Sequence, residues 1–422
     1  LYDFVNKEGL FPDVAPPERF CLLTISGSDV STKEAKFSFF NTNLEMMRDE
    51  SRRYGLSKEQ IENINPNTRS CPAFESKRIR DIAVDIYSKY PVLINEQQGR
   101  NTWDITYHTL FHMTNDTDIF ESNTLENLQE QGYVLSGNKF KKGERNYYPL
   151  YEAKFLHQFD HRFGTFEGVS QDSRFTRRAS TEQVSENQKS DPEFQILPRY
   201  WVYESDFEDQ AENIDWSEDW IFAYRKVVRT TTDFRTAVGT IMPYYPLGNS
   251  AAVLTFDCDS TEERALLFTS LFTSFVFDFV LRQSVGGANL NLYILKQLPM
   301  PTPSCIEEYY VEKNGQEESL KDFLISRALR LCWTSGELNC LGNEIEPNGS
   351  PYDWNQQNRR VIRAEIDAAV AHLYDISQED FRYIINQFDI LKERQKSKYG
   401  YYRRKEECMC EFEDLDVYRR ND

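Results

Sequence analysis

The sequence predicts an α+β fold, in which a mixed sheet with inserted helices is followed by a helical tail. Between about residues 91 and 300, short apolar or aromatic segments alternate with turns rich in Gly, Asn and Pro, a pattern typical of strands. After Pro303 the apolar residues follow helical spacing instead. The chain has 422 residues and is 40% hydrophobic, enough for the two or three packed units usual at this length.

The N-terminal part contains two predicted strands, at residues 19–25 and 36–40. Two short strands do not bury a core by themselves, so we expect them to complete a sheet whose other strands lie upstream of the first residue. Residues 57–60 match the capping box that begins a helix, and an amphipathic helix is predicted for residues 77–90.

The central part carries further strand signals and one segment that is too polar for a core. Strands are predicted around residues 133–138, 164–168 and 200–203. Residues 170–192 are rich in Ser, Gln, Arg and Glu, which indicates a mobile surface loop. Residues 262–283 are predicted to form one buried helix, which ends at Gly286 and Gly287. In the tail, helices are predicted at residues 319–332, 355–374 and 378–394.

The composition indicates a soluble, cytoplasmic protein. No signal peptide is visible, and no stretch reaches the roughly 18 to 20 apolar residues that span a bilayer, so no membrane partner is expected. The eight cysteines are scattered, unlike those of a small disulfide scaffold, and fit a reducing cytoplasm. Cys408 and Cys410 form only a C-x-C without a nearby His, so no metal site is predicted.

The charge is strongly acidic overall and segregated along the chain. A net charge of −19 argues against a protein that binds nucleic acid over its whole surface, because phosphate binding needs clustered Lys and Arg. Residues 139–178, however, contain nine basic and five acidic residues, whereas residues 204–219 contain eight acidic residues and no basic one. Any nucleic-acid contact is therefore expected to be local.

Two basic runs and two asparagines are the candidate DNA-binding residues. Basic side chains interleaved with Phe at 155, 159 and 163 would give a strand one aromatic and one basic face, suited to phosphates; a solvated strand face is the alternative. A second run, which includes Thr230–Thr232, suits phosphate and base-edge hydrogen bonds, and two asparagines near residue 290 could pair with adenine or simply cap a turn. The candidates are Lys154, His157, His161, Arg162, Arg225, Lys226, Arg229, Arg235, Asn289 and Asn291.

Several blocks along the chain, taken in order, carry a resemblance to a known family. They are residues 65–72 (Asn-Pro-Asn-Thr-Arg-Ser-Cys-Pro), 111–116, 149–162, 232–236, 277–283, 286–291 and 297–299. Their order resembles the C-terminal, target recognition half of adenine-specific (N6) DNA methyltransferases of type IIG restriction-modification systems and of BREX- and DISARM-like phage-defence systems.

This resemblance implies an upstream catalytic domain, absent here, that binds S-adenosylmethionine and flips an adenine out of the DNA stack. It implies the end of an α/β methyltransferase domain in residues 1–50, connector helices in 51–95, a target recognition domain in 96–303 and a helical region in 304–422. Double-stranded DNA is the implied partner, with other defence-system subunits as further partners.

The chain itself shows no motif for catalysis. Methyl transfer to adenine needs a Gly-rich turn after a strand and an Asp or Asn followed by Pro-Pro and an aromatic residue, and neither occurs. No catalytic residue and no cofactor are therefore predicted within these residues. His108 with His112, and His157 with His161, are spaced for one helical face but lack the Glu of a zinc motif, so packing roles are preferred.

Two other functions remain open. The chain could be an acidic interaction subunit of a defence complex, whose charge binds a protein partner or mimics DNA. It could also be a complete enzyme of unrelated chemistry, although no set of nucleophile, base and oxyanion donors is visible. Convergence of the two basic runs on one face would favour DNA as the ligand.

Overall fold

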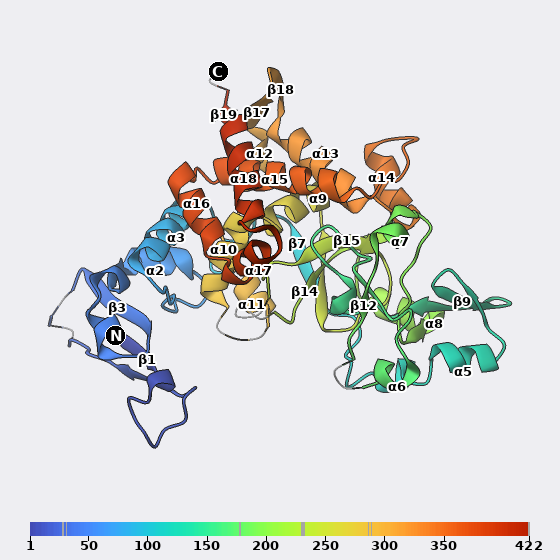
Figure 1. Cartoon of the computed structure of the whole chain (residues 1–422), viewed down its shortest axis with the longest axis horizontal. Coiled ribbons are helices and arrows are strands. Elements are labelled where there is room, and N and C mark those ends of the chain that lie inside the picture. The colour runs from blue at the N-terminus through green and yellow to red at the C-terminus, as the bar shows by residue number, and fades with distance from the viewer. Residues whose placement is uncertain are drawn as a thin grey trace. The chain divides into compact units, whose positions relative to one another are not determined.

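The computed structural model describes residues 1–27, 29–30, 32–176, 179–228, 233–285, 287 and 289–420. It is an α+β protein with 40% helix, 21% strand, several small sheets and a helical C-terminal region, in agreement with the predicted class (Figure 1). The chain divides into two compact units. Unit 1 contains Leu1–Thr102, Phe279–Gly286 and Tyr293–Thr302, and unit 2 contains Trp103–Asp278, Gly287–Leu292 and Pro303–Asp422.

Unit 1 contains a mixed four-stranded sheet in the order β2-β1-β3-β4. Its strands are β1 (Tyr2–Val5), β2 (Arg19–Leu22), β3 (Glu34–Asn41) and β4 (Tyr54–Ser57). Strand β1 pairs in parallel with β3 and antiparallel with β2, while β3 and β4 are antiparallel. Both strands predicted in this region are present, although the first ends at Leu22 rather than at residue 25. Phe4 and Phe20 stack with their ring centroids 5.2 Å apart.

The helices of unit 1 lie partly between the strands of this sheet and partly after them in sequence. They are α1 (Leu44–Arg48), α2 (Lys58–Ile64) and α3 (Lys77–Lys89), with the 3-10 turns η1 (Asn6–Glu8) and η2 (Glu50–Arg52). The predicted capping box is confirmed, because the Gln60 amide donates to Ser57 Oγ and the Ser57 amide donates to Gln60 Oε1. The predicted amphipathic helix is confirmed as α3, which buries Ile79, Ile82 and Ile86.

Unit 1 also joins segments that are distant in sequence. The Leu93 amide donates to the Leu298 carbonyl at 2.9 Å, and the Met300 amide donates to the Pro91 carbonyl at 3.0 Å. A short hairpin of β5 (Ile94–Asn95) and β6 (Arg100–Asn101) follows. The chain passes between the units within α10 (Phe275–Ser284) and α11 (Leu292–Leu295).

The central sheet of unit 2 has the order β15-β14-β16-β7. Its strands are β7 (Ile105–His108), β14 (Trp220–Arg225), β15 (Gly239–Pro243) and β16 (Ala251–Phe256). Every pairing in it is antiparallel. The prediction of a mixed sheet within residues 96–303 is therefore wrong for the central sheet. Parallel and antiparallel pairings occur together in the sheet of unit 1.

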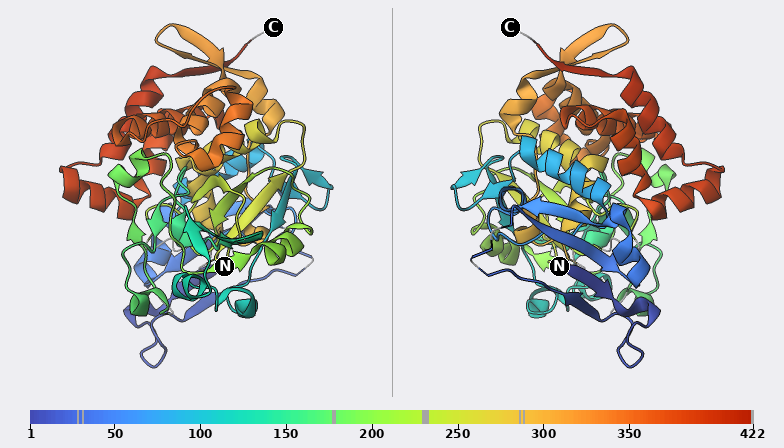
Figure 2. Two further views of the ribbon diagram at one scale, coloured as in Figure 1. Left: turned by 90° about the vertical axis from the view of Figure 1, so that its right-hand side faces the viewer. Right: turned by 90° about the vertical axis from the view of Figure 1, so that its left-hand side faces the viewer.

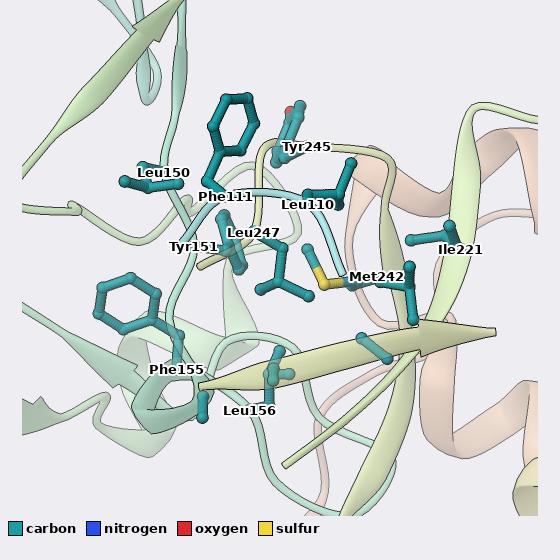
Figure 3. Packing of buried hydrophobic residues seen from close by; sticks show 14 of the residues in the cluster. Leu110, Phe111, Leu150, Tyr151, Phe155, Leu156, Ile221, Met242, Tyr245 and Leu247 are labelled. Atoms are coloured by element: carbon teal, nitrogen blue, oxygen red, sulfur yellow. The ribbon is translucent and has the colours of Figure 1, made fainter. Parts of the chain in front are cut away.

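Both faces of the central sheet are covered, because successive side chains of a strand point to opposite faces. On one face Phe222 contacts Phe268 of α9 (Thr261–Phe272), with ring centroids 5.2 Å apart. On the other face Ile221 and Met242 join a core cluster with Tyr151 and Leu247 from the surrounding loops (Figure 3). The loops around this face are thus held by apolar burial as well as by hydrogen bonds.

A second antiparallel sheet in unit 2 has the order β13-β10-β9-β8. Its strands are β8 (Val134–Ser136), β9 (Lys139–Lys142), β10 (Arg145–Pro149) and β13 (Trp201–Tyr203). The neighbouring helices are α4 (Thr117–Phe120), α5 (Leu125–Glu130) and α8 (Glu204–Ala211). The strands predicted near residues 133–138 and 200–203 are confirmed as β8 and β13, and Trp201 is fully buried against Phe140.

The polar segment 170–192 is more structured than a surface loop. It contains α6 (Gln171–Arg174), β12 (Glu182–Gln183) and α7 (Glu186–Ser190), and β12 pairs with β11 (Gly164–Thr165). Residues 177 and 178 lie outside the described residues. Lys189 is buried and bonded to the buried carboxylate of Asp160, so a charged pair helps to fix this segment together with Val184, which is buried in the core.

The single helix predicted for residues 262–283 is wrong, because α9 and α10 meet at a bend of 68°. The hydroxyls of Thr269 and Thr273 donate to carbonyls four residues earlier, which bends helices. The Asp367 carboxylate accepts the amide of Phe275 at the start of α10. Within the described part of the chain, no single helix is long and apolar enough to cross a membrane, and this bent pair alone meets that test by length and composition.

The C-terminal region of unit 2 consists of helices and a small sheet. The helices are α12 (Pro303–Glu307), α13 (Leu320–Cys332), α14 (Asn339–Ile345), α15 (Gln356–Leu373), α16 (Gln378–Asn386), α17 (Asp389–Tyr399) and α18 (Arg403–Asp414). The predicted helices at 319–332 and 355–374 are confirmed, but the third is divided into α16 and α17. The sequence did not predict the sheet β18-β17-β19, made of Gln316–Ser319, Tyr309–Lys313 and Asp416–Arg419 (Figure 2).

The buried pair of Lys189 and Asp160 predicts a large effect of removing one partner. Lys189→Met leaves a buried carboxylate without its ammonium, which typically costs about 3–5 kcal/mol of folding free energy. The control Lys396→Met removes an exposed pair with Glu393, and should cost less than about 1 kcal/mol. Urea unfolding of both variants tests this, and equal costs would contradict it.

The same pair predicts a pH dependence. Burial alone would raise the pKa of the Asp160 carboxyl, but Lys189 and Arg359 outweigh it and lower the pKa to about 2. Because an unfolded Asp titrates near about 3.9, the carboxylate stabilises the fold above about pH 4 and loses this contribution as the pH falls towards 2. The stability difference between the unmodified chain and Asp160→Asn should therefore shrink between pH 5 and pH 3. A constant difference would show that Asp160 does not carry this linkage.

Candidate functional site

Arg162, a predicted DNA contact, is a fully buried residue whose Nη1 and Nη2 donate inside unit 2, while its Nε has no hydrogen-bond partner among the described residues. Its guanidinium donates to four backbone carbonyls, at 2.7–3.1 Å. The acceptors are the carbonyls of Lys189, Asp191, Phe194 and Thr334. Arg162 therefore joins separate segments of the chain and is not accessible to a phosphate at the surface.

His161 and Arg235 are buried as well. His161 is 2% exposed, and its Nε2 lies 3.6 Å from Glu337 Oε2. Arg235 is 5% exposed and forms an ion pair with Asp278 at 2.7 Å. The alternation of basic and aromatic residues predicted a two-faced strand, but residues 153–155 form the 3-10 turn η3 and Phe159 has a positive φ of 58°. The alternation is thus broken, and His161 and Arg162 are buried together with Phe155 and Phe159.

Lys154 is partly exposed but already has partners. Its Nζ lies 3.2 Å from Glu152 Oε2 and donates to the Ala179 carbonyl at 3.0 Å. Burial lowers the pKa of this ammonium, and Glu152 opposes that shift. Arg199 shares the same carboxylate through two hydrogen bonds of 2.8 Å.

The structure brings four other candidates closer to the surface. His157 stacks on Phe163 with ring centroids 4.6 Å apart, and the Arg225 guanidinium lies 5.6 Å from the same ring. Arg225 ends β14, and Lys226 follows it as a partly exposed residue. The Lys226 carbonyl accepts the amide of Leu290, next to the exposed Asn289.

These contacts place Lys226 and Val227, near the start of the second basic run, beside the segment that carries the asparagines. Val227 and Asn289 form an isolated antiparallel bridge, and Val227 is 46% exposed. Asn291 is only partly exposed. Arg229, with Thr230–Thr232, lies outside the described residues.

Arg363 on α15 is a cation that the sequence analysis missed. It is partly exposed, and its Nη2 donates to Gln158 Oε1 at 2.5 Å. No carboxylate of the described residues lies within ion-pair distance of it. Burial, followed by the charges of Arg404 and Arg235, lowers the pKa of Arg363 to about 9. Asp367, one helical turn after Arg363, forms an ion pair with Arg404 instead.

The positive charge near Arg363 is therefore only partly neutralised. Burial, followed by the charges of Arg225 and Arg363, also holds the pKa of His157 well below its usual value, so this imidazole is neutral near pH 7. A like-charged environment of this kind favours binding of an anion, and a guanidinium can hold a phosphate through two parallel hydrogen bonds. We call the partly exposed residues His157, Arg225, Lys226 and Arg363, together with the buried Gln158 that accepts from Arg363, the Arg363 surface.

One sequence signal could have identified Arg363. Arg359 and Arg363 are four residues apart on a predicted helix, and thus share a face with the buried Ile362 and Ile366. Arg359 is 6% exposed and donates to the carbonyls of Leu331 and Phe159. Basic residues on the inward side of an amphipathic helix indicate internal or ligand-binding charges.

The histidine pairs considered as metal ligands do not share helical faces. His108 lies on β7 and its Nε2 lies 3.0 Å from Thr255 Oγ1, whereas His112 lies in the following turn. Among the residues that the structure describes, no group of three or more His, Cys, Asp or Glu side chains is placed to hold a metal ion. No protein-family model matches the sequence, and no curated protein matches it.

The charge around Arg363 predicts stabilisation by inorganic phosphate. At a phosphate concentration ten times the dissociation constant, binding should add about 1.4 kcal/mol to the free energy of unfolding. Thermal unfolding at constant ionic strength measures this. The stabilisation should be lost in Arg363→Gln, which keeps a donor for Gln158, and retained in the control Arg330→Gln at an exposed position. Equal stabilisation of both variants would place the anion elsewhere.

Proposed function

We propose that the chain is the DNA-reading portion of a site-specific adenine-N6 DNA methyltransferase from a restriction-modification or phage-defence system. In such an enzyme the methyl donor S-adenosylmethionine binds to a catalytic domain, and the residues of this chain position the duplex and read its sequence. The order of sequence blocks from residue 65 to residue 299 supports the proposal. Methyl transfer itself is assigned to the catalytic domain.

The observation that carries the proposal is the incompletely neutralised charge of the Arg363 surface. Cations supply most of the sequence-independent affinity for DNA, and their phosphate contacts fix its position. Lys226 and Arg363 are the residues proposed to contact phosphate. Asn289, exposed beside the Val227 bridge, is proposed to contact a base edge, because an Asn amide can form two hydrogen bonds with adenine.

The buried candidates take a different role in this proposal. Arg162 and Arg235 hold the loops that present the Arg363 surface, through bonds to carbonyls and to Asp278, and His161 is buried beside Glu337. Lys154 contributes a weaker positive potential, because Glu152 neutralises part of its charge. The acidic run 204–219 begins with α8, which packs against β10 and β13. Its charge would repel phosphate and help to orient the duplex.

An acidic interaction subunit of a defence complex is the second candidate function. The specific observation in its favour is the acidic run itself, with Glu208 and Asp219 exposed. The two functions differ in the ligand charge: a DNA-reading chain binds anionic phosphates, whereas an acidic interaction subunit binds cationic groups of a partner.

Binding of the chain to a pool of random duplex DNA at several salt concentrations tests the proposal. Affinity should fall linearly on a double logarithmic plot, and Lys226→Ala or Arg363→Gln should each reduce the slope by about 1, because each removes about one phosphate contact. The control Arg330→Ala removes an exposed charge and should leave the slope unchanged. Failure of the folded chain to bind at low salt would contradict the proposal, and so would equal slopes for all variants.

A further inference from the structure

A pocket of about 660 Å³ in unit 2 combines aromatic walls with carboxylates. Tyr148, Phe207, Tyr244 and Tyr245 supply the aromatic surface. The carboxylates of Glu193, Glu204, Glu208, Asp219 and Glu337 line the same space. A volume of this size suits a small organic ligand or one long side chain.

The pocket already accommodates one cation of this chain. Lys139 lies with its Nζ 4.7 Å from the Tyr148 ring centroid and 5.0 Å from that of Tyr245. Aromatic faces attract cations because their ring quadrupole is negative above the plane. Burial lowers the pKa of this ammonium, and Glu337 opposes the shift. Lys139 therefore shows that these aromatic rings and carboxylates can hold an alkylammonium group.

The two tyrosine rings are fixed by carboxylates of the same pocket. The Tyr148 hydroxyl donates to Glu204 Oε1 at 3.2 Å, and the Tyr245 hydroxyl donates to Glu337 Oε1 at 3.0 Å. The rings are thus held in place before any ligand binds, which lowers the entropic cost of binding.

One buried carboxylate of the pocket is incompletely satisfied. The Glu337 side chain is 4% exposed, and its Oε2 accepts no hydrogen bond from the described residues. Its nearest basic group is His161 Nε2, at 3.6 Å. The hydroxyl of Tyr244 is also buried without a hydrogen-bond partner in the described structure. Buried polar atoms without partners are uncommon, and a ligand with N–H donors would compensate them.

We propose that this pocket binds an organic cation, an alkylammonium or guanidinium group on an apolar stem. Its charge is held by the carboxylates, and its stem packs on the tyrosine and phenylalanine rings. The cation is either a free polyamine or a Lys or Arg side chain of a partner protein. The site is separate from the Arg363 surface, so it does not depend on DNA binding.

Calorimetric titration of the whole chain with spermidine, arginine amide and a short Lys- and Arg-rich peptide tests the proposal. Citrulline amide, which has the shape of arginine amide without its charge, is the matched ligand control. The cations should bind and citrulline amide should not. The tightest ligand identifies the source: spermidine indicates a free polyamine, and the peptide indicates a protein partner. Absence of binding by all cations at millimolar concentration overturns the proposal.

Three variants distinguish this pocket from general attraction to an acidic protein. Asp219→Asn, at an exposed position, should weaken binding at least fivefold, and Lys139→Met should tighten it severalfold, because the resident ammonium repels the ligand. The control Glu212→Gln removes an exposed carboxylate outside the pocket lining, and should leave affinity unchanged. Equal effects of Asp219→Asn and Glu212→Gln, or weaker binding to Lys139→Met, would overturn the proposal.

Discussion

The buried guanidinium of Arg162 is the constraint on which the rest of unit 2 depends. Arginine remains charged when buried, so each donor that finds an acceptor offsets part of the free-energy cost of burying it. Here carbonyls from residues 189–194 and from Thr334 accept four hydrogen bonds from Nη1 and Nη2, although Nε has no partner among the described residues, and these bonds tie three segments of the chain together. Arg359 on α15 acts in the same way, through the carbonyls of Leu331 and Phe159. The loop that carries His157 and Gln158 is thereby fixed to the C-terminal helices.

This arrangement leaves Arg363 with the amide of Gln158 as its hydrogen-bond acceptor, while Arg235 and Arg404 each bond an aspartate. An incompletely balanced cation thus lies at a partly exposed position of a protein with a net charge of −19. The acidic counterpart lies around α8, where carboxylates and aromatic rings form the pocket beside Lys139. Segregation of this kind lets one acidic chain attract an anion at one place and a cation at another.

Much of the fold could be predicted from the sequence, because some elements carry clear local sequence signals. Helices α3, α13 and α15 have apolar spacing and a hydrogen-bonding N-cap, at Ser76, Ser319 and Asn355. The break between α9 and α10 could not be predicted from apolar spacing, because it depends on hydroxyls and on the distant Asp367.

The candidate site was harder to predict than the fold. The basic residues near Phe159 alternate with aromatic residues, yet the positive φ of Phe159 and the turn η3 break the alternation, and His161 and Arg162 are buried. Whether an arginine faces solvent or carbonyl groups depends on tertiary contacts, as Arg162 and Arg363 illustrate. The proximity of Lys226 to Asn289 also required the structure, because the strand end and the asparagine are about 60 residues apart in sequence.

A crystal structure of the chain with a short duplex DNA would show whether the Arg363 surface binds the DNA backbone, because it locates every phosphate. Phosphate oxygens should lie within hydrogen-bond distance of the Arg363 guanidinium, with Lys226 facing the same DNA backbone and Asn289 at a base edge. A duplex bound elsewhere, with Arg363 still bonded to Gln158 alone, would contradict this prediction.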